Sequence, residues 1–260
     1  MKRLIVIILL CILHTGLYIC AQEQMTSITD TDKTLNKNEQ KNLERMIEYE
    51  IGFFNRIFLD KPYIKLDAEI IVFSNYAAYL AYQHEIGKTV RIRSAGFYSG
   101  EKRQIVICKD QFEKSFLNTC YHELSHFFLA ERTIYAPIWL NEGIATYMDG
   151  VKISSKDIKH EIGRYFVSRV KTGIQLRDIN LREFVSWSGR EFSEVSFSHD
   201  GYGYAIAHCM IYLMMDNEEV AFNIMRAICN DKATTIEAFD LHYAGGFDQF
   251  EKDFSNRYSV

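Results

Sequence analysis

The chain has 260 residues, of which 48% are hydrophobic and 25% are charged, a balance typical of globular proteins. Its formal net charge is −4 and it contains no block of basic residues, which argues against nucleic acid as a partner. After an apolar N-terminal segment, about 240 residues remain, a length that suits one sizeable domain.

Residues 1–21 predict a cleaved secretory signal. Lys2 and Arg3 supply the charged start, Leu4–Leu13 is the apolar run, and Ala21 is a small residue at the cleavage point. We therefore expect an exported protein, periplasmic or secreted. A membrane anchor is the competing interpretation, but the apolar run is short for a span. Lipidation at Cys20 is disfavoured because bulky residues precede it.

Residues 22–42 are rich in Thr, Gln, Asn and Lys and predict a flexible leader. A single domain is expected over 43–260, with a sheet-containing lobe to about residue 110 and a helical part over 111–260. Apolar residues recur at helical spacing from Glu44 to Phe58. No apolar run after residue 21 is long enough to cross a membrane.

Strand patterns follow the first helix. A β-branched run over Asp67–Phe73 predicts a strand, and Asn75–His84 predicts a helix. Two alternating runs, Val90–Tyr98 and Gln104–Cys108, are joined through Gly100 and indicate a hairpin. These segments predict a small sheet ahead of the main helices.

The first chemical motif is H-E-x-x-H, formed by His122, Glu123 and His126. On a helix the two histidines lie one turn apart on the same face, so both imidazoles can reach one metal ion. Glu123 can then contact a metal-bound water without ligating the metal. A metzincin site would need Gly and His where this chain has Leu129 and Arg132, so that alternative fails.

The second motif is W-L-N-E-G, which contains Glu142. Pro137 suits the first turn of a helix and Gly150 suits its end. The residues between them are largely apolar, and a carboxylate in such a setting needs a partner. Zn²⁺ held by His122 and His126 would provide one, because hydrolytic zinc sites use three protein ligands and an open position.

Helices are expected through most of the remaining chain. Ser154 and Asp157 predict the start of a helix that ends before Gly173, and Leu181–Trp187 predicts a shorter one. The polar, glycine-rich run Ser196–Tyr204 resembles a functional loop ahead of a long apolar helix. The closing helices are expected at Glu218–Cys229, Thr235–His242 and Phe247–Tyr258.

The cysteines and remaining histidines have simpler interpretations. Buried free thiols are favoured over disulfides for Cys108, Cys120, Cys209 and Cys229. His208, in the apolar helix, is expected to be a hydrogen-bonded core residue. His160 and His242 are expected at the surface of helices.

The runs HELSH and PIWLNEGIATY resemble the gluzincin zinc metallopeptidases, and most closely the small bacterial peptidase MA-like domains. The resemblance implies an α+β fold: a thermolysin-like zincin with a small N-terminal mixed sheet, an H-E-x-x-H helix and a mostly helical C-terminal lobe. It implies Zn²⁺ bound by His122, His126 and Glu142. It also implies a substrate-side strand at Ala95, Gly96, Phe97 and Tyr98, although a hairpin that merely covers the core is an equal alternative.

The family's oxyanion-stabilising tyrosine corresponds to Tyr204, with Tyr202 and then His199 as alternatives. Two departures from the family pattern matter. No G-A-M-E-N run is present, so nothing supports an aminopeptidase. Thr146 stands where thermolysin-like enzymes have an acid that supports a metal ligand.

Together these features predict an exported zinc-dependent metallopeptidase that acts on a peptide or protein substrate. Metal-activated water would attack the carbonyl, with Glu123 as general base. The alternative is a catalytically silent zincin-like domain that binds zinc or a partner; the intact Glu123 argues against it. Attack on a non-peptide amide stays open.

Overall fold

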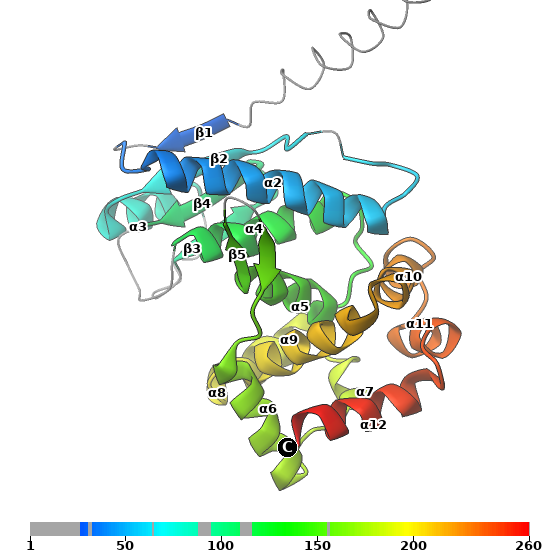
Figure 1. Ribbon diagram of the computed structural model, residues 1–260. Helices are drawn as coiled ribbons and strands as arrows, with labels where there is room; N and C mark the ends of the chain where they lie inside the picture. Colours follow the sequence, from blue (N-terminus) through cyan, green and yellow to red (C-terminus); the bar gives the residue numbers. More distant parts are fainter. Residues whose placement is uncertain are drawn as a thin grey trace, which may run out of the picture.

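The computed structural model describes residues 27–30, 33–63, 65–87, 95–109, 116–154 and 157–259. The predicted signal at 1–21 lies outside this part. The described chain is α+β, with a small mixed sheet followed by packed helices, as expected (Figure 1). In chain order the elements are β1 Ser27–Asp30, α2 Lys37–Ile57, β2 Glu69–Phe73, α3 Tyr76–Glu85, β3 Gly96–Ser99, β4 Gln104–Cys108, α4 Phe116–Ala130, α5 Ile138–Asp149, β5 Val151–Ile153, β6 Ile158–His160, α6 Arg164–Leu176, α7 Leu181–Phe184, α8 Gly189–Ser198, α9 Tyr202–Met214, a 3-10 turn Met215–Asn217, α10 Glu218–Cys229, α11 Thr235–His242 and α12 Gly246–Tyr258.

The sheet has the order β1-β2-β4-β3, with β3 antiparallel to β4 and the other pairs parallel. Side chains alternate between its two faces, as the pleat requires. Ile105 and Ile107 of β4 enter the main core with α2 and α4, whereas Val106 packs with Tyr79 of α3 on the other face. The predicted hairpin is present as β3–β4, although residues 90–94 of its first predicted strand lie outside the described residues. β3 is the edge strand of the described sheet.

The predicted flexible leader is wrong where the structure describes it. Ser27–Asp30 pairs in parallel with β2, and α2 begins at Lys37, seven residues before the predicted start. Asn36 caps α2: its Oδ1 accepts from the backbone N–H of Glu39, and the Glu39 carboxylate accepts from the Asn36 N–H. This reciprocal box satisfies helix-end donors and stabilises the extra turns, although they carry no apolar stripe.

Two central helices lie between the sheet and the C-terminal helices. α4 packs against β3, β4 and α2, and α5 lies between α4 and α9. A Cβ at Gly143 would lie 3.0 Å from Ala207 O of α9, so the glycine allows this close approach. His208 is a core residue as predicted: it is 1% exposed, accepts from Gly163 N–H at 3.2 Å and donates to Thr146 O at 3.1 Å.

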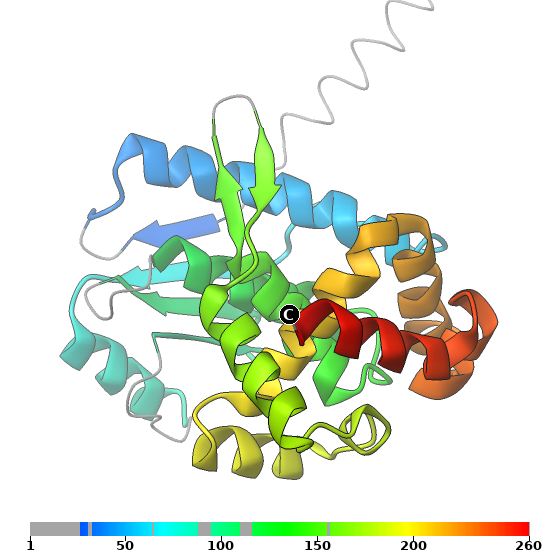
Figure 2. The same ribbon diagram turned by 60° about the horizontal axis from the view of Figure 1, so that its bottom comes forward.

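The predicted helix start at Ser154 and Asp157 is wrong. These residues lie between β5 and β6, which form a hairpin over α2 (Figure 2). The Asp157 N–H donates to Ser154 Oγ at 3.0 Å, and Ser154 N–H donates back to Asp157 O at 2.9 Å. The Ser-x-x-Asp pattern that predicted a helix cap therefore closes a turn between two strands. His160 consequently lies on a strand, half-buried, and not on the surface of a helix.

The next helices also depart from expectation. α6 begins at Arg164 and runs past Gly173 to Leu176, where Arg177 adopts a left-handed conformation with φ 59°. The expected short helix is present as α7. A helix that the sequence analysis missed, α8, takes in Ser196–Ser198 of the predicted loop and is capped by Ser188 and Glu191. The three closing helices lie where predicted, to within one residue.

The preference for buried thiols over disulfides is confirmed: Cys108, Cys120, Cys209 and Cys229 are buried, and no disulfide joins any two of them. Each lies in apolar surroundings, and burial raises the pKa of the Cys229 thiol to about 12. Among the described residues, no helix is both long and apolar enough to cross a membrane.

Candidate metal centre

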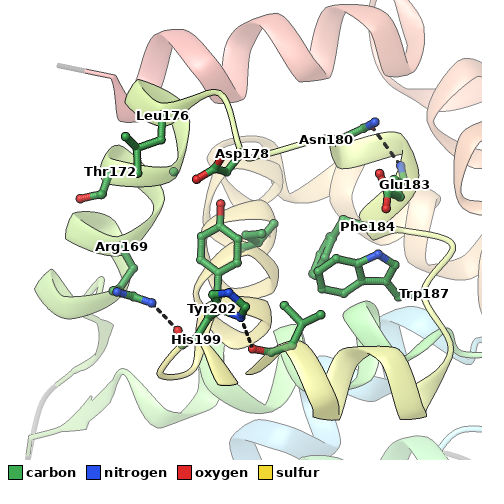
Figure 3. Close-up of a pocket in the computed structure, with 13 residues that line it drawn as sticks. Arg169, Thr172, Leu176, Asp178, Asn180, Glu183, Phe184, Trp187, His199 and Tyr202 are labelled. Carbon is green, nitrogen blue, oxygen red and sulfur yellow. Dashed lines mark hydrogen bonds between the residues drawn. The ribbon is translucent and has the colours of Figure 1, made fainter. Parts of the chain in front are cut away.

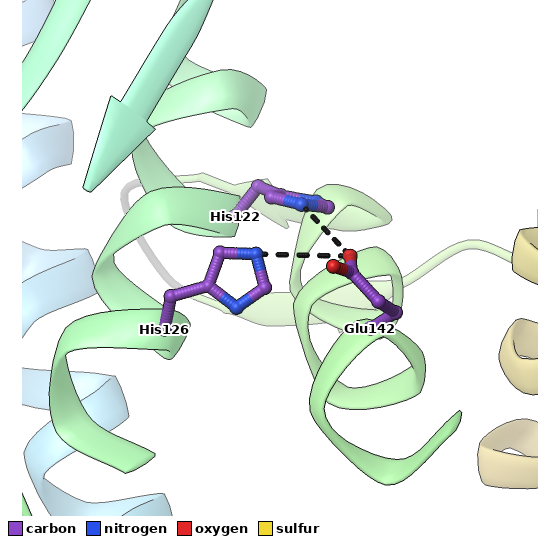
Figure 4. A group of neighbouring side chains, drawn as sticks. All are labelled: His122, His126 and Glu142. Atoms are coloured by element: carbon purple, nitrogen blue, oxygen red, sulfur yellow. Dashed lines mark ion pairs between the residues drawn. The ribbon is translucent and has the colours of Figure 1, made fainter. Parts of the chain in front are cut away.

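The crossing of α4 and α5 brings His122, His126 and Glu142 together (Figure 4). Each offers one ligand atom, and these atoms all lie within 4.8 Å of one another. Both imidazoles project from the same side of α4, one turn apart, with ring centroids 4.8 Å apart. The sequence prediction of a three-residue cluster therefore matches the arrangement in the structure.

The spacing of the three atoms matches a shared metal better than direct hydrogen bonds. Glu142 Oε2 lies 3.5 Å from His122 Nε2 and 3.7 Å from His126 Nε2. Good N–H···O bonds are about 2.7–3.2 Å long. Ligands bound about 2.0–2.1 Å from one tetrahedral Zn²⁺ are separated by roughly 3.3 Å. The donor set, two imidazoles and one carboxylate, is also one that zinc accepts.

Asn141 orients the second histidine. Its Oδ1 lies 2.9 Å from His126 Nδ1, and because an amide oxygen only accepts, Nδ1–H is the donor. That leaves the His126 Nε2 lone pair directed at Glu142. The residue directly before the predicted carboxylate ligand thus fixes the tautomer that metal binding requires.

Asp149, at the end of α5, lies next to the imidazole of His122, the first histidine of the motif. Asp149 Oδ2 lies 3.5 Å from His122 Nδ1, on the side of the ring away from Glu142. Burial alone lowers the pKa of His122, but the carboxylates of Asp149 and Glu142 outweigh it and hold that pKa well above its usual range. The site therefore favours positive charge, supplied by a proton or by a cation.

Thermolysin-like enzymes have a supporting acid at the position of Thr146, and Thr146 does not replace it. Its hydroxyl donates to the backbone oxygens of Glu142, at 2.8 Å, and Gly143, at 3.0 Å. Asp149 was missed, although a signal was present. It follows Glu142 by seven residues, two helical turns, and so shares the face that meets α4.

Glu123, the predicted base, lies beside the edge strand. A Cβ at Gly96 of β3 would be only 3.3 Å from Glu123 Cγ, and 2.7 Å from Thr119 Cγ2 of the same helix. Ala95 O accepts from Cys108 N–H at 2.7 Å, which joins this strand to β4. Tyr98 packs on Phe127 of α4, with ring centroids 5.8 Å apart. Three of the four predicted substrate residues thus have a defined position next to α4 or β4.

Phe97 faces away from α4, with its ring 5.9 Å from that of Tyr79 on α3. Because side chains alternate along a strand, this orientation follows from the positions of Gly96 and Tyr98. Any contact between Phe97 and a substrate at this edge would therefore involve its backbone.

The three candidates for oxyanion stabilisation separate on the two sides of α9. Tyr202 and His199 line a cavity on the side away from α5. Tyr204 lies about 200° around the helix from Tyr202 and is not among the residues that line this cavity. Its ring is half-buried and 5.0 Å from that of Phe192. The assignment of Tyr204 as the oxyanion donor stays a prediction.

A buried acid lies behind the motif helix. Glu50 of α2 is 0% exposed, and its Oε2 accepts from Ser125 Oγ at 3.1 Å. Burial raises the pKa of Glu50 well above its usual range. Its placement gives α4 a polar contact on the face opposite the sheet edge. Nothing in its spacing from the motif, 72 positions before His122, could have indicated this contact.

A scan against models of protein families finds no match to this chain, and a search of curated protein sequences finds none either.

Proposed function

We propose that the protein is a zinc-dependent hydrolase of peptide bonds, with His122, His126 and Glu142 as the metal ligands. The observation that carries the proposal is the placement of Glu142 Oε2 at 3.5 and 3.7 Å from the two Nε2 atoms, the separation of groups that share an ion. A bound Zn²⁺ would supply a Lewis acid and lower the pKa of a coordinated water. The resemblance of both motifs to gluzincins supports the same reading.

The chain's own residues would divide the remaining work. Glu123 follows the first ligand and would accept a proton from the attacking water and return it to the leaving amine. Tyr204 is the candidate donor to the developing oxyanion. Asn141 and Asp149 would hold the imidazoles with their Nε2 atoms toward the ion.

The edge strand supports an extended peptide as the substrate. β3 is the last strand of the described sheet, and Gly96 brings its backbone against Glu123. An extended chain can add to such an edge through main-chain hydrogen bonds, which are independent of side-chain identity. This favours a peptide over a small amide and leaves side-chain preference to other surfaces.

A zinc-binding domain without catalytic activity is the rival. The experiment that separates the two compares the purified protein with Glu123→Gln, His126→Ala and a surface control, Glu85→Gln, which lies on α3. Zinc content is measured by mass spectrometry, and hydrolysis is measured on an unfolded, fluorescently labelled protein.

We expect the unmutated protein and Glu85→Gln to bind one zinc and cleave. Glu123→Gln should keep zinc and lose cleavage, whereas His126→Ala should lose both. Stoichiometric zinc without cleavage of a broad peptide library would support the silent domain. Absence of zinc binding would reject the metal centre itself.

A further inference from the structure

A cavity lies in the C-terminal half, between α6, α7, α8 and α9 (Figure 3). Its volume is about 400 Å³, within the range of small-molecule sites. None of its lining residues comes from α4 or α5, so it is separate from the metal centre. The lining residues are Arg169, Thr172, Gly173, Leu176, Asp178, Asn180, Glu183, Phe184, Trp187, Val195, His199, Tyr202 and Ile206.

The walls of this cavity are mainly apolar and aromatic. Phe184 and Trp187 meet edge-to-face with ring centroids 5.0 Å apart. The Tyr202 ring forms another side of the same space (Figure 3). Aromatic faces of this kind attract organic cations as well as apolar groups.

Two carboxylates face the same space. Asp178 follows α6 and Glu183 lies on α7, and both line the cavity, at different parts of its wall (Figure 3). In the part of the chain that the structure describes, neither forms an ion pair. Both are exposed and need no partner for stability, so their charge is available to a ligand.

The one cation in the lining, Arg169, is already engaged. Its guanidinium donates to the backbone oxygen of His199 and lies 5.9 Å from the centroid of the Tyr202 ring. The lining therefore contains two carboxylates and one guanidinium. An anionic ligand would have to approach Asp178 and Glu183, which disfavours it.

A hydrogen-bond acceptor completes the site. The Tyr202 Oη is buried and has no hydrogen-bond partner among the described residues. It points toward Asp178 in Figure 3. A buried hydroxyl without a partner is unfavourable, and a ligand N–H would satisfy it.

We propose that this cavity binds an organic cation, an ammonium or guanidinium group on an apolar stem. Asp178, Glu183 and the Tyr202 hydroxyl receive the charged head, and Phe184 and Trp187 pack on the stem. A free amine and the basic side chain of a peptide share this chemistry. The site is independent of zinc and of peptide hydrolysis.

Calorimetry with three matched probes tests the proposal: phenethylammonium, 2-phenylethanol and 3-phenylpropionate. We expect the cation to bind roughly tenfold or more tightly than the alcohol, because its hydrogen bonds are charge-assisted, and the carboxylate to bind weakest. Equal binding of cation and alcohol, or preference for the carboxylate, would overturn the proposal.

Substitutions of the two acids test whether their charges bind the cation. Asp178→Asn and Glu183→Gln should each weaken phenethylammonium binding by roughly tenfold. Glu194→Gln is the control, since this exposed acid on α8 pairs with Arg190 and does not line the cavity. All three positions are exposed, so the variants should fold, which circular dichroism checks. Unchanged binding in both acid variants would reject the assignment.

Tryptophan fluorescence tests whether the apolar stem of the ligand packs on Trp187. The chain has two tryptophans, and Trp139 is fully buried elsewhere, so the ligand should alter emission from Trp187 alone. The change should disappear in Trp187→Phe, and its persistence would place the ligand outside this cavity. Competition by a lysine-containing pentapeptide then identifies the source: displacement indicates a basic side chain, and failure of displacement indicates a free amine.

Discussion

His122 Nδ1 lies 3.5 Å from Asp149 Oδ2, so the last residue of α5 holds the first histidine of the H-E-x-x-H motif. The same α5 carries Glu142 on the other side of that ring, 3.5 Å from Nε2. One helix therefore supplies both a candidate metal ligand and the group that orients another. Asn118 of α4 also donates to Asp149 O at 2.6 Å, which fixes the helix crossing itself.

Asp149→Asn should reduce zinc affinity by roughly tenfold to a hundredfold, because it removes the negative charge that orients His122 and increases its basicity as a ligand. Competition with a chromogenic chelator measures the affinity. Asp157→Asn, at the exposed turn of the β5–β6 hairpin, is the matched control and should bind zinc normally. Equal affinities of the two variants would show that Asp149 has no part in the site.

Gly96→Ala should lower kcat/KM by roughly tenfold to a hundredfold while leaving zinc content unchanged, since small displacements next to a reacting group are costly. The added Cβ would meet Ile107 Cδ1 and Thr119 Cγ2 at 2.7 Å, so either β3 or these two side chains must shift, next to Glu123. Gly100→Ala in the β3–β4 turn is the control, because its nearest atom is Tyr98 Oη at 3.5 Å. Full activity of Gly96→Ala would contradict a role for this edge in substrate binding.

Glu50→Gln should leave the protein at least as stable as the unmutated chain near neutral pH. The folded pKa of Glu50 lies above its ordinary value of 4.5. The folded state therefore binds the proton more strongly, and this group reduces stability as the pH rises above 4.5. Glutamine has nearly the shape of the protonated glutamic acid but does not ionise, so the variant should not lose folding stability in this way as the pH rises. Urea unfolding at several pH values measures it, and the advantage should disappear in acid.

The control for that comparison is Ser125→Ala, which removes the donor to Glu50 and should cost about 1 kcal/mol. A large loss of stability in Glu50→Gln at neutral pH would mean that the ionised carboxylate stabilises the fold.

His160 should make the metal-free protein less stable in mild acid. Burial lowers the pKa of His160 from 6.5 to about 4, and the Tyr147 carbonyl and Glu218 oppose it only in part. Between these values the unfolded chain binds more protons, so stability falls as the pH drops from 6.5 toward 4 and levels off below. The full effect is roughly 3 kcal/mol.

His160→Phe should flatten this part of the pH profile, because it keeps a ring on Tyr147, 3.9 Å away between centroids, without a titrating group. It also removes the 2.7 Å bond to Tyr49 Oη, so its stability near neutral pH should be lower. His84→Phe, at an exposed position on α3, should keep the profile of the unmutated protein. Urea unfolding with a chelator present measures all three. An unchanged slope in His160→Phe would assign the acid sensitivity to other groups.

The sequence alone determined the features that depend on local spacing. The i, i+4 histidines and the isolated carboxylate in an apolar helix identified the three members of the candidate metal site, because helix geometry fixes which residues share a face. Apolar periodicity placed α10, α11 and α12 to within a residue. The cysteine environment was likewise readable from the apolar residues around each thiol.

Only the tertiary structure decided the features that depend on contacts between distant segments. Asp149 reaches His122 because α5 crosses α4, and Glu50 reaches Ser125 because α2 packs behind it. The S-x-x-D pattern at Ser154 closes a turn instead of starting a helix, because the flanking residues pair as β5 and β6. Tyr202 lines the cavity beside α6, whereas Tyr204, two residues on, packs against Phe192 of α8, and only the packing of α9 among its neighbours separates the two. A polar or charged side chain in the sequence has several possible partners, and the packing of the helices and strands determines which of them it contacts.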